Sequence, residues 1–139
     1  MTIIGPEGPL VNGIVNKFTE QGLKIFGPTK EHAILEGSKV FSKEFMKNYD
    51  IPTSDYEMFS DKAEAKSYIS TKKHPIVIKA DGLAAGKGVV VSSSIEESNN
   101  AIDKLLSAAH SDFIVIEEFL SGQELSAIYI LSLIHISEP

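Results

Sequence analysis

The chain has 139 residues, of which 42% are apolar and 23% charged, a composition typical of a soluble globular domain. Thirteen basic and nineteen acidic residues give a formal charge of −6, which argues against a nucleic-acid or anionic-membrane surface. The lack of Cys excludes disulfides, a thiolate nucleophile and Cys-based zinc sites, and no apolar run is long enough to span a bilayer. We therefore expect a cytoplasmic protein that acts on small molecules.

The first part of the chain has the rhythm of a βαβ unit. Residues 2–4 predict a short strand, and a turn rich in Gly and Pro follows it. Apolar residues then recur at helical spacing over residues 11–18, and residues 23–26 predict a second strand that stops at Gly27. This order predicts two strands at the end of a parallel sheet.

The remainder alternates helices with strands. The expected helices are 29–35, 38–49, 60–69 and 95–106, and the expected strands are 75–79, 89–91, 113–118 and 124–130. No internal repeat and no low-complexity linker interrupts this order, so the pattern favours an α/β (α+β) fold.

A glycine-rich loop, within IKADGLAAGKGVVV at residues 78–91, is the first candidate for chemistry. The familiar phosphate loop has four residues between its first Gly and Gly-Lys, and a helix follows it. Here three residues separate Gly82 from Gly86, and the valines at 89–91 favour a strand. The loop therefore predicts a hairpin that folds over a phosphate group; a hairpin of purely structural use is the alternative.

Lysine side chains flank this loop. Lys79 ends an apolar strand, where an ammonium group either reaches solvent or meets an anion, because a buried unpaired charge is costly. The glycine pattern that follows favours an anion as the partner of the Lys79 ammonium group. Backbone N–H groups of Gly82, Gly86 and Gly88 are free to approach it, and Lys87 adds a positive charge.

Three acidic residues near the end of the chain form a second candidate. Glu117 and Glu118 are neighbours on a strand, so their side chains point to opposite faces, which argues against a carboxylate dyad. The strand end at 117–120 offers backbone groups to a purine, and Glu124 offers a carboxylate to ribose hydroxyls. Charged residues that merely close an edge strand are an equal alternative.

Two further positions are weaker candidates. Lys39 lies near a helix N-terminus, where a cation is unfavourable unless a negative group is nearby, although a surface lysine is the ordinary interpretation. Glu7 follows a strand at a turn, where open α/β sheets bind ligands, but it also suits the first turn of a helix.

With these residues in view, the chain closely resembles the phosphoribosylamine–glycine ligase family, ATP-grasp enzymes of purine biosynthesis. The resemblance covers residues 2 to about 129 and rests on GPEGPLVNGIV, GLKIFGPT, LEGSKVFSKEFM, IPTSDY, PIVIKADGLAAGKGVVV and IEEFLSGQELS. It implies a fragment: residues 1–28 end a truncated pre-ATP-grasp βαβ domain, and residues 29–130 form a partial ATP-grasp domain.

The resemblance also implies a set of site residues. The residues expected to bind ATP are Lys39, Lys79, Gly82, Leu83, Ala84, Ala85, Gly86, Lys87, Gly88, Glu117, Glu118, Phe119, Leu120 and Glu124. Lys79 and Lys87 would stabilise phosphate charge, Glu7 would lie near the amine substrate, and no protein nucleophile is needed.

The implied reaction joins glycine to 5-phosphoribosylamine with cleavage of ATP, through glycyl phosphate. Mg²⁺ or Mn²⁺ would assist, but its Glu and Asn ligands belong to a later part of the family pattern, so we expect no metal ligand here. We expect a monomeric parent protein and no activity from the isolated chain. The alternatives are another ATP-grasp carboxylate-amine ligase and a nucleotide-binding module without catalysis.

The last nine residues, LSLIHISEP at 131–139, form a separate segment. They resemble the translation of a transposon-end sequencing adapter, so we expect natural sequence to end at about Ile130. An apolar C-terminal strand is the alternative.

Overall fold

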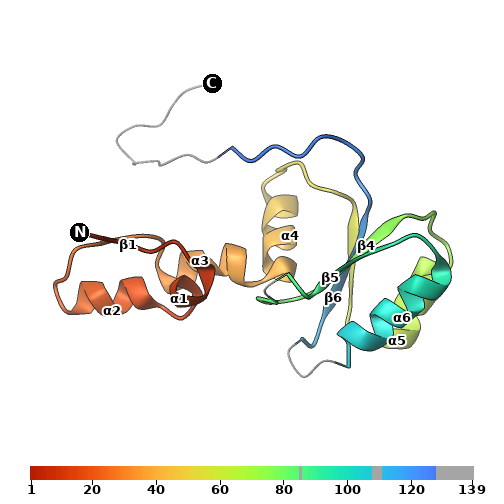
Figure 1. Ribbon diagram of the computed structural model, residues 1–139, viewed down its shortest axis with the longest axis horizontal. Coiled ribbons are helices and arrows are strands. Elements are labelled where there is room, and N and C mark those ends of the chain that lie inside the picture. Colours follow the sequence, from red (N-terminus) through yellow and green to blue (C-terminus); the bar gives the residue numbers. More distant parts are fainter. Residues whose placement is uncertain (85, 108–110, 128–139) are drawn as a thin grey trace.

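The computed structural model describes residues 1–84, 86–107 and 111–127, and these residues form two lobes (Figure 1). The elements of the first lobe are β1 (Thr2–Ile3), α1 (Glu7–Val11), α2 (Ile14–Glu20), β2 (Ile25–Phe26) and α3 (Lys30–Gly37). Strands β1 and β2 are parallel, with Thr2 opposite Ile25. The predicted βαβ unit is therefore confirmed.

The helix predicted over residues 11–18 is interrupted. α1 ends at Val11 and α2 begins at Ile14, because Gly13 between them has φ of 78°. A residue with positive φ cannot continue a right-handed helix. Apolar spacing gave no sign of this break, since it reports which side chains are buried and not the backbone conformation of a glycine between them.

The second lobe is built on one antiparallel sheet with the strand order β3-β6-β4-β5. Its elements are α4 (Lys39–Asn48), β3 (Tyr56–Phe59), α5 (Lys62–Ile69), β4 (Ile76–Ala80), β5 (Val89–Ser92), α6 (Ile95–Leu105) and β6 (Ile114–Glu118). The strands predicted at 75–79, 89–91 and 113–118 are confirmed. None of the described helices is long and apolar enough to cross a membrane.

Two predictions about strands were wrong or incomplete. The sequence did not predict β3, a short edge strand that is defined by its pairing with β6. Conversely, residues 124–127 form no strand within the described part of the chain, and Leu125 is exposed, so apolar alternation alone did not create one. The rest of that predicted strand, and the predicted adapter segment at 131–139, lie outside the described residues.

Polar side chains cap the N-termini of three of the helices that the sequence predicts. The Ser38 hydroxyl accepts a hydrogen bond from the N–H of Phe41, and the Asp61 carboxylate accepts from the N–H groups of two residues of α5. The Ser94 hydroxyl begins α6 in the same way. Thr29 differs, because its hydroxyl bonds to the His32 ring and not to a backbone N–H.

The core lies between the sheet and the helices α5 and α6, which cover one face (Figure 1). The buried residues are Ala65, Ile69, Ile76, Ile78, Ala80, Ala101, Ile102, Leu105, Ile114 and Ile116. Because side chains alternate along a strand, the remaining residues of β4 and β6 point to the opposite face, the outer face, on the side of α4. This alternation brings Lys79 and Glu117 together on the outer face.

Candidate functional site

The glycine loop forms a hairpin between β4 and β5, as the sequence predicts. The N–H of Ala80 donates to the carbonyl of Gly88 at 2.7 Å, which closes the base of the loop. Gly82 and Gly86 have φ of 81° and 77°, a region that side chains with a Cβ rarely adopt. A Cβ on Gly88 would lie 2.5 Å from that of Ala84. The glycines are therefore needed for the loop to close on itself.

Replacing Gly88 with Ala is expected to destabilise the protein by about 1–3 kcal/mol, because the added methyl group overpacks the loop against Ala84. Gly122→Ala is the matched control, since a methyl group added there would meet nothing within 4 Å. Urea unfolding of both variants checks this prediction. Equal unfolding midpoints for the two variants would contradict it.

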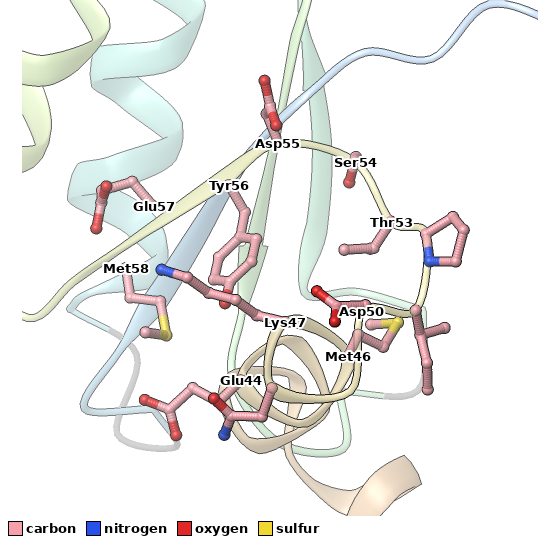
Figure 2. Close-up of a pocket in the computed structure, with 13 residues that line it drawn as sticks. Glu44, Met46, Lys47, Asp50, Thr53, Ser54, Asp55, Tyr56, Glu57 and Met58 are labelled. Carbon is pink, nitrogen blue, oxygen red and sulfur yellow. The ribbon is translucent and has the colours of Figure 1, made fainter.

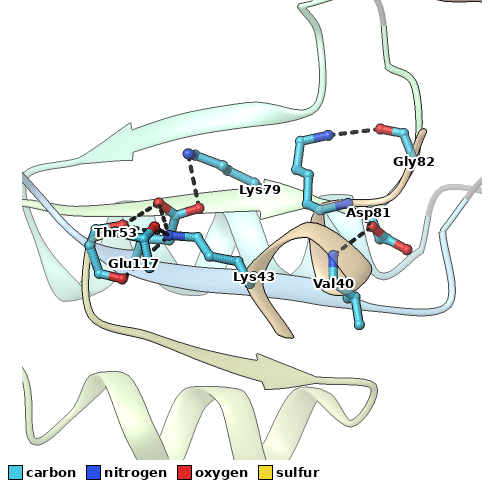
Figure 3. Close-up of polar contacts among 9 residues, drawn as sticks. Val40, Lys43, Thr53, Lys79, Asp81, Gly82 and Glu117 are labelled. Carbon is cyan, nitrogen blue, oxygen red and sulfur yellow. Dashed lines mark hydrogen bonds and ion pairs between the residues drawn. The ribbon is translucent and has the colours of Figure 1, made fainter. Parts of the chain in front are cut away.

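A carboxylate ties the base of this hairpin to α4 (Figure 3). Asp81 accepts hydrogen bonds from the N–H groups of Lys39 at 2.6 Å and Val40 at 3.1 Å, and from the Ser38 hydroxyl. The Lys39 ammonium in turn donates to the carbonyl of Gly82 at 2.7 Å. Asp81 is thus the negative group that a cation at this helix N-terminus requires, and it fixes the hairpin relative to the helix.

A cavity of about 350 Å³ brings together residues that the sequence predicts as separate candidates. The lining residues are Glu7, Leu35, Glu36, Lys39, Ser42, Gly82, Leu83, Ala84, Gly86, Gly88 and Val89. Glu7 comes from the first lobe, so the cavity lies where the two lobes meet. Lys87 is exposed and does not line this cavity, and Ala85 lies outside the described residues.

A buried charged group lies beside this region on the outer face: the Glu117 cluster, made of Lys43, Ser54, Lys79 and Glu117 (Figure 3). Lys79 Nζ lies 2.9 Å from Glu117 Oε1, and Lys43 Nζ lies 3.1 Å from Oε2. The Ser54 hydroxyl donates to Oε2 at 2.6 Å. By contrast, Glu118 is exposed and accepts from the N–H of Asp55, so the two glutamates form no dyad.

The Glu117 carboxyl is held in its ionised form. Burial acts to raise its pKa, but hydrogen bonds from Ser54, Lys79 and Lys43 outweigh burial and hold the pKa below its ordinary value of 4.5. A carboxylate that two ammonium groups contact remains negative at neutral pH.

Acidification is expected to remove the stability that this carboxylate contributes. Because the folded-state pKa is lowered, the contribution is complete above the unfolded pKa and is lost as the pH falls from about 4.5 through the folded value. The difference in free energy of unfolding between wild type and Glu117→Gln should therefore narrow below pH 4.5. Urea titrations between neutral and acidic pH check this; a constant difference would contradict it.

The outer face leaves an open path along β4. Lys79 pairs with Val89 of β5, and Val77 pairs with Val91, so these four side chains share the face. Val89 and Val91 are 43% and 53% exposed. The strand end at 117–120 lies opposite the start of β4, whereas the glycine hairpin lies at the other end, so Lys79 lies between them.

The end of β6, where the sequence predicts purine binding at residues 117–120, is exposed beyond Glu117. Phe119 and Leu120 are 44% and 64% exposed, and Glu124 is exposed as well. A cavity of about 410 Å³ reaches Glu117, Glu118 and Phe119 from the loop before β4. The structure thus places Lys39 and the hairpin glycines at one end of β4 and the strand end at 117–118 at the other, with Lys79 one residue before the hairpin end of β4.

A larger cavity, of about 820 Å³, lies elsewhere, between the end of α4 and β3 (Figure 2). Its charged lining residues are Glu44, Lys47, Asp50, Asp55 and Glu57. Four carboxylates against one ammonium would repel a polyphosphate, and none of the predicted site residues lines it. Cavity size therefore does not locate the residues that the sequence predicts to bind a nucleotide.

Sequence reasoning missed two residues of the site. Lys43 follows Lys39 by one helical turn, which places both on one side of α4, but nothing in the sequence indicated that a carboxylate from β6 lies there. Asp81 stands within the glycine motif, yet its partners lie about forty residues earlier. Both contacts depend on the tertiary fold.

Models of known families match the whole region of the site. The description "Phosphoribosylglycinamide synthetase, ATP-grasp (A) domain" applies to residues 37–137, and the N domain of the same synthetase matches residues 1–36. The boundary between the two matched models falls after residue 36, in the last turn of α3 and just before α4, close to the cavity that Glu7 and Lys39 line.

Individual proteins agree with this match. The chain is 52% identical over 130 residues to the phosphoribosylamine–glycine ligase of Halalkalibacterium halodurans, covering 91% of this chain and 30% of that protein. It is 51% identical over 140 residues to the Escherichia coli K12 ligase, covering 98% of this chain and 33% of that protein.

A solved structure agrees as well. The phosphoribosylamine–glycine ligase of Thermotoga maritima superposes with a TM-score of 0.67 at 38% identity, covering 87% of this chain and 30% of that one. The chain therefore spans about a third of the length of the curated relatives it matches. From the family match, these identities and the shared fold, the chain belongs to the phosphoribosylglycinamide synthetase family and carries part of its ATP-grasp domain.

Proposed function

We propose that this chain supplies the ATP-binding part of a ligase that joins glycine to 5-phosphoribosylamine, giving glycinamide ribonucleotide, ADP and phosphate. The observation that carries the proposal is the position of Lys79, on the outer face beside the exposed valines of β5 and between the glycine hairpin and the strand end at 117–120. In this proposal residues 1–28 belong to the preceding domain and residues 29–130 form the nucleotide-binding part of the ATP-grasp domain. The whole ligase would be a cytoplasmic protein.

In this proposal ATP lies along the outer face. The adenine ring would bond to the backbone at 117–120, the ribose to Glu124, and the phosphates would pass Lys79 and end beneath the hairpin. The exposed valines beside Lys79 offer an apolar surface, and the glycine N–H groups of the hairpin offer donors to phosphate oxygens. Lys39 and Lys87 would add positive charge at the hairpin.

The proposed chemistry needs position and charge but no protein nucleophile. The carboxylate of glycine attacks the γ-phosphorus of ATP, which gives glycyl phosphate and ADP. The amine of 5-phosphoribosylamine then attacks the acyl carbon and displaces phosphate. Lysine ammonium groups fixed beforehand lower the cost of the charge that develops on the transferred phosphoryl group. Glu7, in the cavity with Lys39, would accept a hydrogen bond from the amine substrate.

A divalent metal is expected in such a reaction, and its Glu and Asn ligands belong to a later part of the family pattern. Within residues 1–84, 86–107 and 111–127, no group of three or more His, Asp or Glu side chains is placed to hold a metal ion. We therefore derive no step through the metal.

A substrate-dependence assay on the ligase that carries this sequence tests the proposal. ADP and glycinamide ribonucleotide should form only when glycine and 5-phosphoribosylamine are both present, and the 139-residue chain alone should give no turnover. ADP release driven by a different amine would point to another carboxylate-amine ligase. Binding of ATP with no turnover on any amine would point to a nucleotide-binding module.

A further inference from the structure

The Glu117 cluster carries a surplus positive charge. One carboxylate faces two ammonium groups, and both Glu117 and Lys43 have side chains that are only 7% exposed. Lys79 is the more accessible member, with 28% of its side chain exposed. A largely buried group of charges with one cation in excess is stabilised by an anion that approaches from the accessible side.

The two lysines hold the carboxylate in different ways. Lys43 Nζ contacts Oε2 and also donates to the hydroxyls of Thr53 at 2.8 Å and Ser54 at 2.7 Å. The ring of Tyr56 lies 5.2 Å from the same ammonium group. Lys79 Nζ contacts Oε1, its one partner among the described residues. Lys43 is therefore fixed by several partners. Lys79 would lose only its contact with Glu117 if its ammonium group moved to another anion.

We propose that Lys43 is a positioning residue that keeps Glu117 neutralised and so frees Lys79 to leave Glu117 and bind the phosphates of the nucleotide. Lys79 pairs with Glu117 when no nucleotide is bound and turns to the phosphates when one is. Glu117 is never left as an unpaired buried charge, because Lys43 stays on Oε2 in both states. This inference rests on the proposed function.

Loss of Lys43 is expected to weaken the binding of phosphate groups selectively, an effect that loss of packing alone would not produce. Lys79 would become the sole cation on a buried carboxylate, so its departure toward phosphate would leave that carboxylate unpaired. Binding of phosphate groups would weaken, whereas binding of the adenine ring, which needs only the strand end, would not. Removing the carboxylate as well should release Lys79 again.

The test measures dissociation constants of ATP and of adenosine by calorimetry on the ligase that carries this sequence. The variants are Lys43→Met, the double variant Lys43→Met/Glu117→Gln and the control Lys47→Met, one helical turn away on the same helix. Lys43→Met is expected to weaken ATP binding about tenfold or more with adenosine binding unchanged, and the double variant to return to within about threefold of wild type. Lys47→Met should match wild type.

The outcomes distinguish failure of the inference about Lys43 from failure of the proposed function on which it rests. If wild type prefers ATP to adenosine and Lys43→Met keeps the same preference, the inference is wrong and the nucleotide site stands. If wild type shows no preference for ATP, the proposed function fails and the inference fails with it. Should Lys43→Met not fold, the double variant decides: a folded double variant that has lost the preference for ATP overturns the inference.

Discussion

Replacing Lys79 with Met is expected to lower glycine-dependent ADP formation by about 100-fold to 1,000-fold in the ligase that carries this sequence. A loss of this size is typical when one fixed donor is removed from a site where negative charge develops in the transition state. Lys79 occupies that place in the proposal because it lies on the outer face between the glycine hairpin and the strand end at 117–120.

The fold should tolerate this change. Glu117 keeps its contacts with Lys43 and with the Ser54 hydroxyl when Lys79 is lost, so the carboxylate stays paired. Lys66→Met is a suitable control, because Lys66 also makes an ion pair, with Asp103 at 2.8 Å, but joins α5 to α6 on the far side of the sheet. Turnover of Lys79→Met within about threefold of the control would show that Lys79 does not act on the phosphates.

Replacing Glu117 with Ala is expected to lower the free energy of unfolding by about 3–5 kcal/mol, the usual cost of removing one partner from a buried ion pair. Lys43 would remain in a site that leaves its side chain only 7% exposed, without a carboxylate to neutralise it. Its bonds to neighbouring hydroxyls satisfy its donors but not its charge.

The adjacent glutamate gives the control for this prediction. Glu118→Ala removes a carboxylate of the same strand that is exposed and accepts one backbone hydrogen bond, at 2.9 Å from Asp55. Its expected cost is about 1 kcal/mol. Urea unfolding of the two variants measures the difference directly. Similar losses for both variants would mean that burial of the Glu117 cluster contributes little to stability.

Much of this fold could be predicted from local patterns. The strand at 75–79 and the strand at 113–118 are short apolar runs bounded by turns, and the helices begin at Ser38, Asp61 and Ser94 because these side chains accept backbone N–H bonds there. Such signals depend on residues within one or two turns of each other. They remain valid whatever the rest of the chain does.

The sequence-based predictions were wrong where contacts between distant residues, or a single backbone angle, determine the secondary structure. β3 is a strand because β6 pairs with it, and the stretch after the turn at Gly122 is not one within residues 124–127 because no described strand pairs with it. The break at Gly13 depends on one backbone angle. None of these has a local apolar signature.

The same distinction applies to the site. The glycine hairpin was predictable because its glycines and the valines that follow specify a strand-loop-strand form. The role of Asp81 as a cap for α4 and that of Lys43 beneath Glu117 were not, because each joins residues far apart in the sequence. A sequence motif thus locates a binding loop more readily than it locates the residues that hold the loop and its lysines in place.

The most direct test of the nucleotide site is to titrate the 139-residue chain with ATP and, separately, with adenosine. NMR chemical shifts of the backbone amides then report which residues each ligand contacts. The account predicts shifts at 117–120 with both ligands, and shifts at Gly82, Gly86 and Gly88 with ATP alone. Shifts that cluster instead around the acidic cavity between α4 and β3, with the glycine hairpin unchanged, would contradict it.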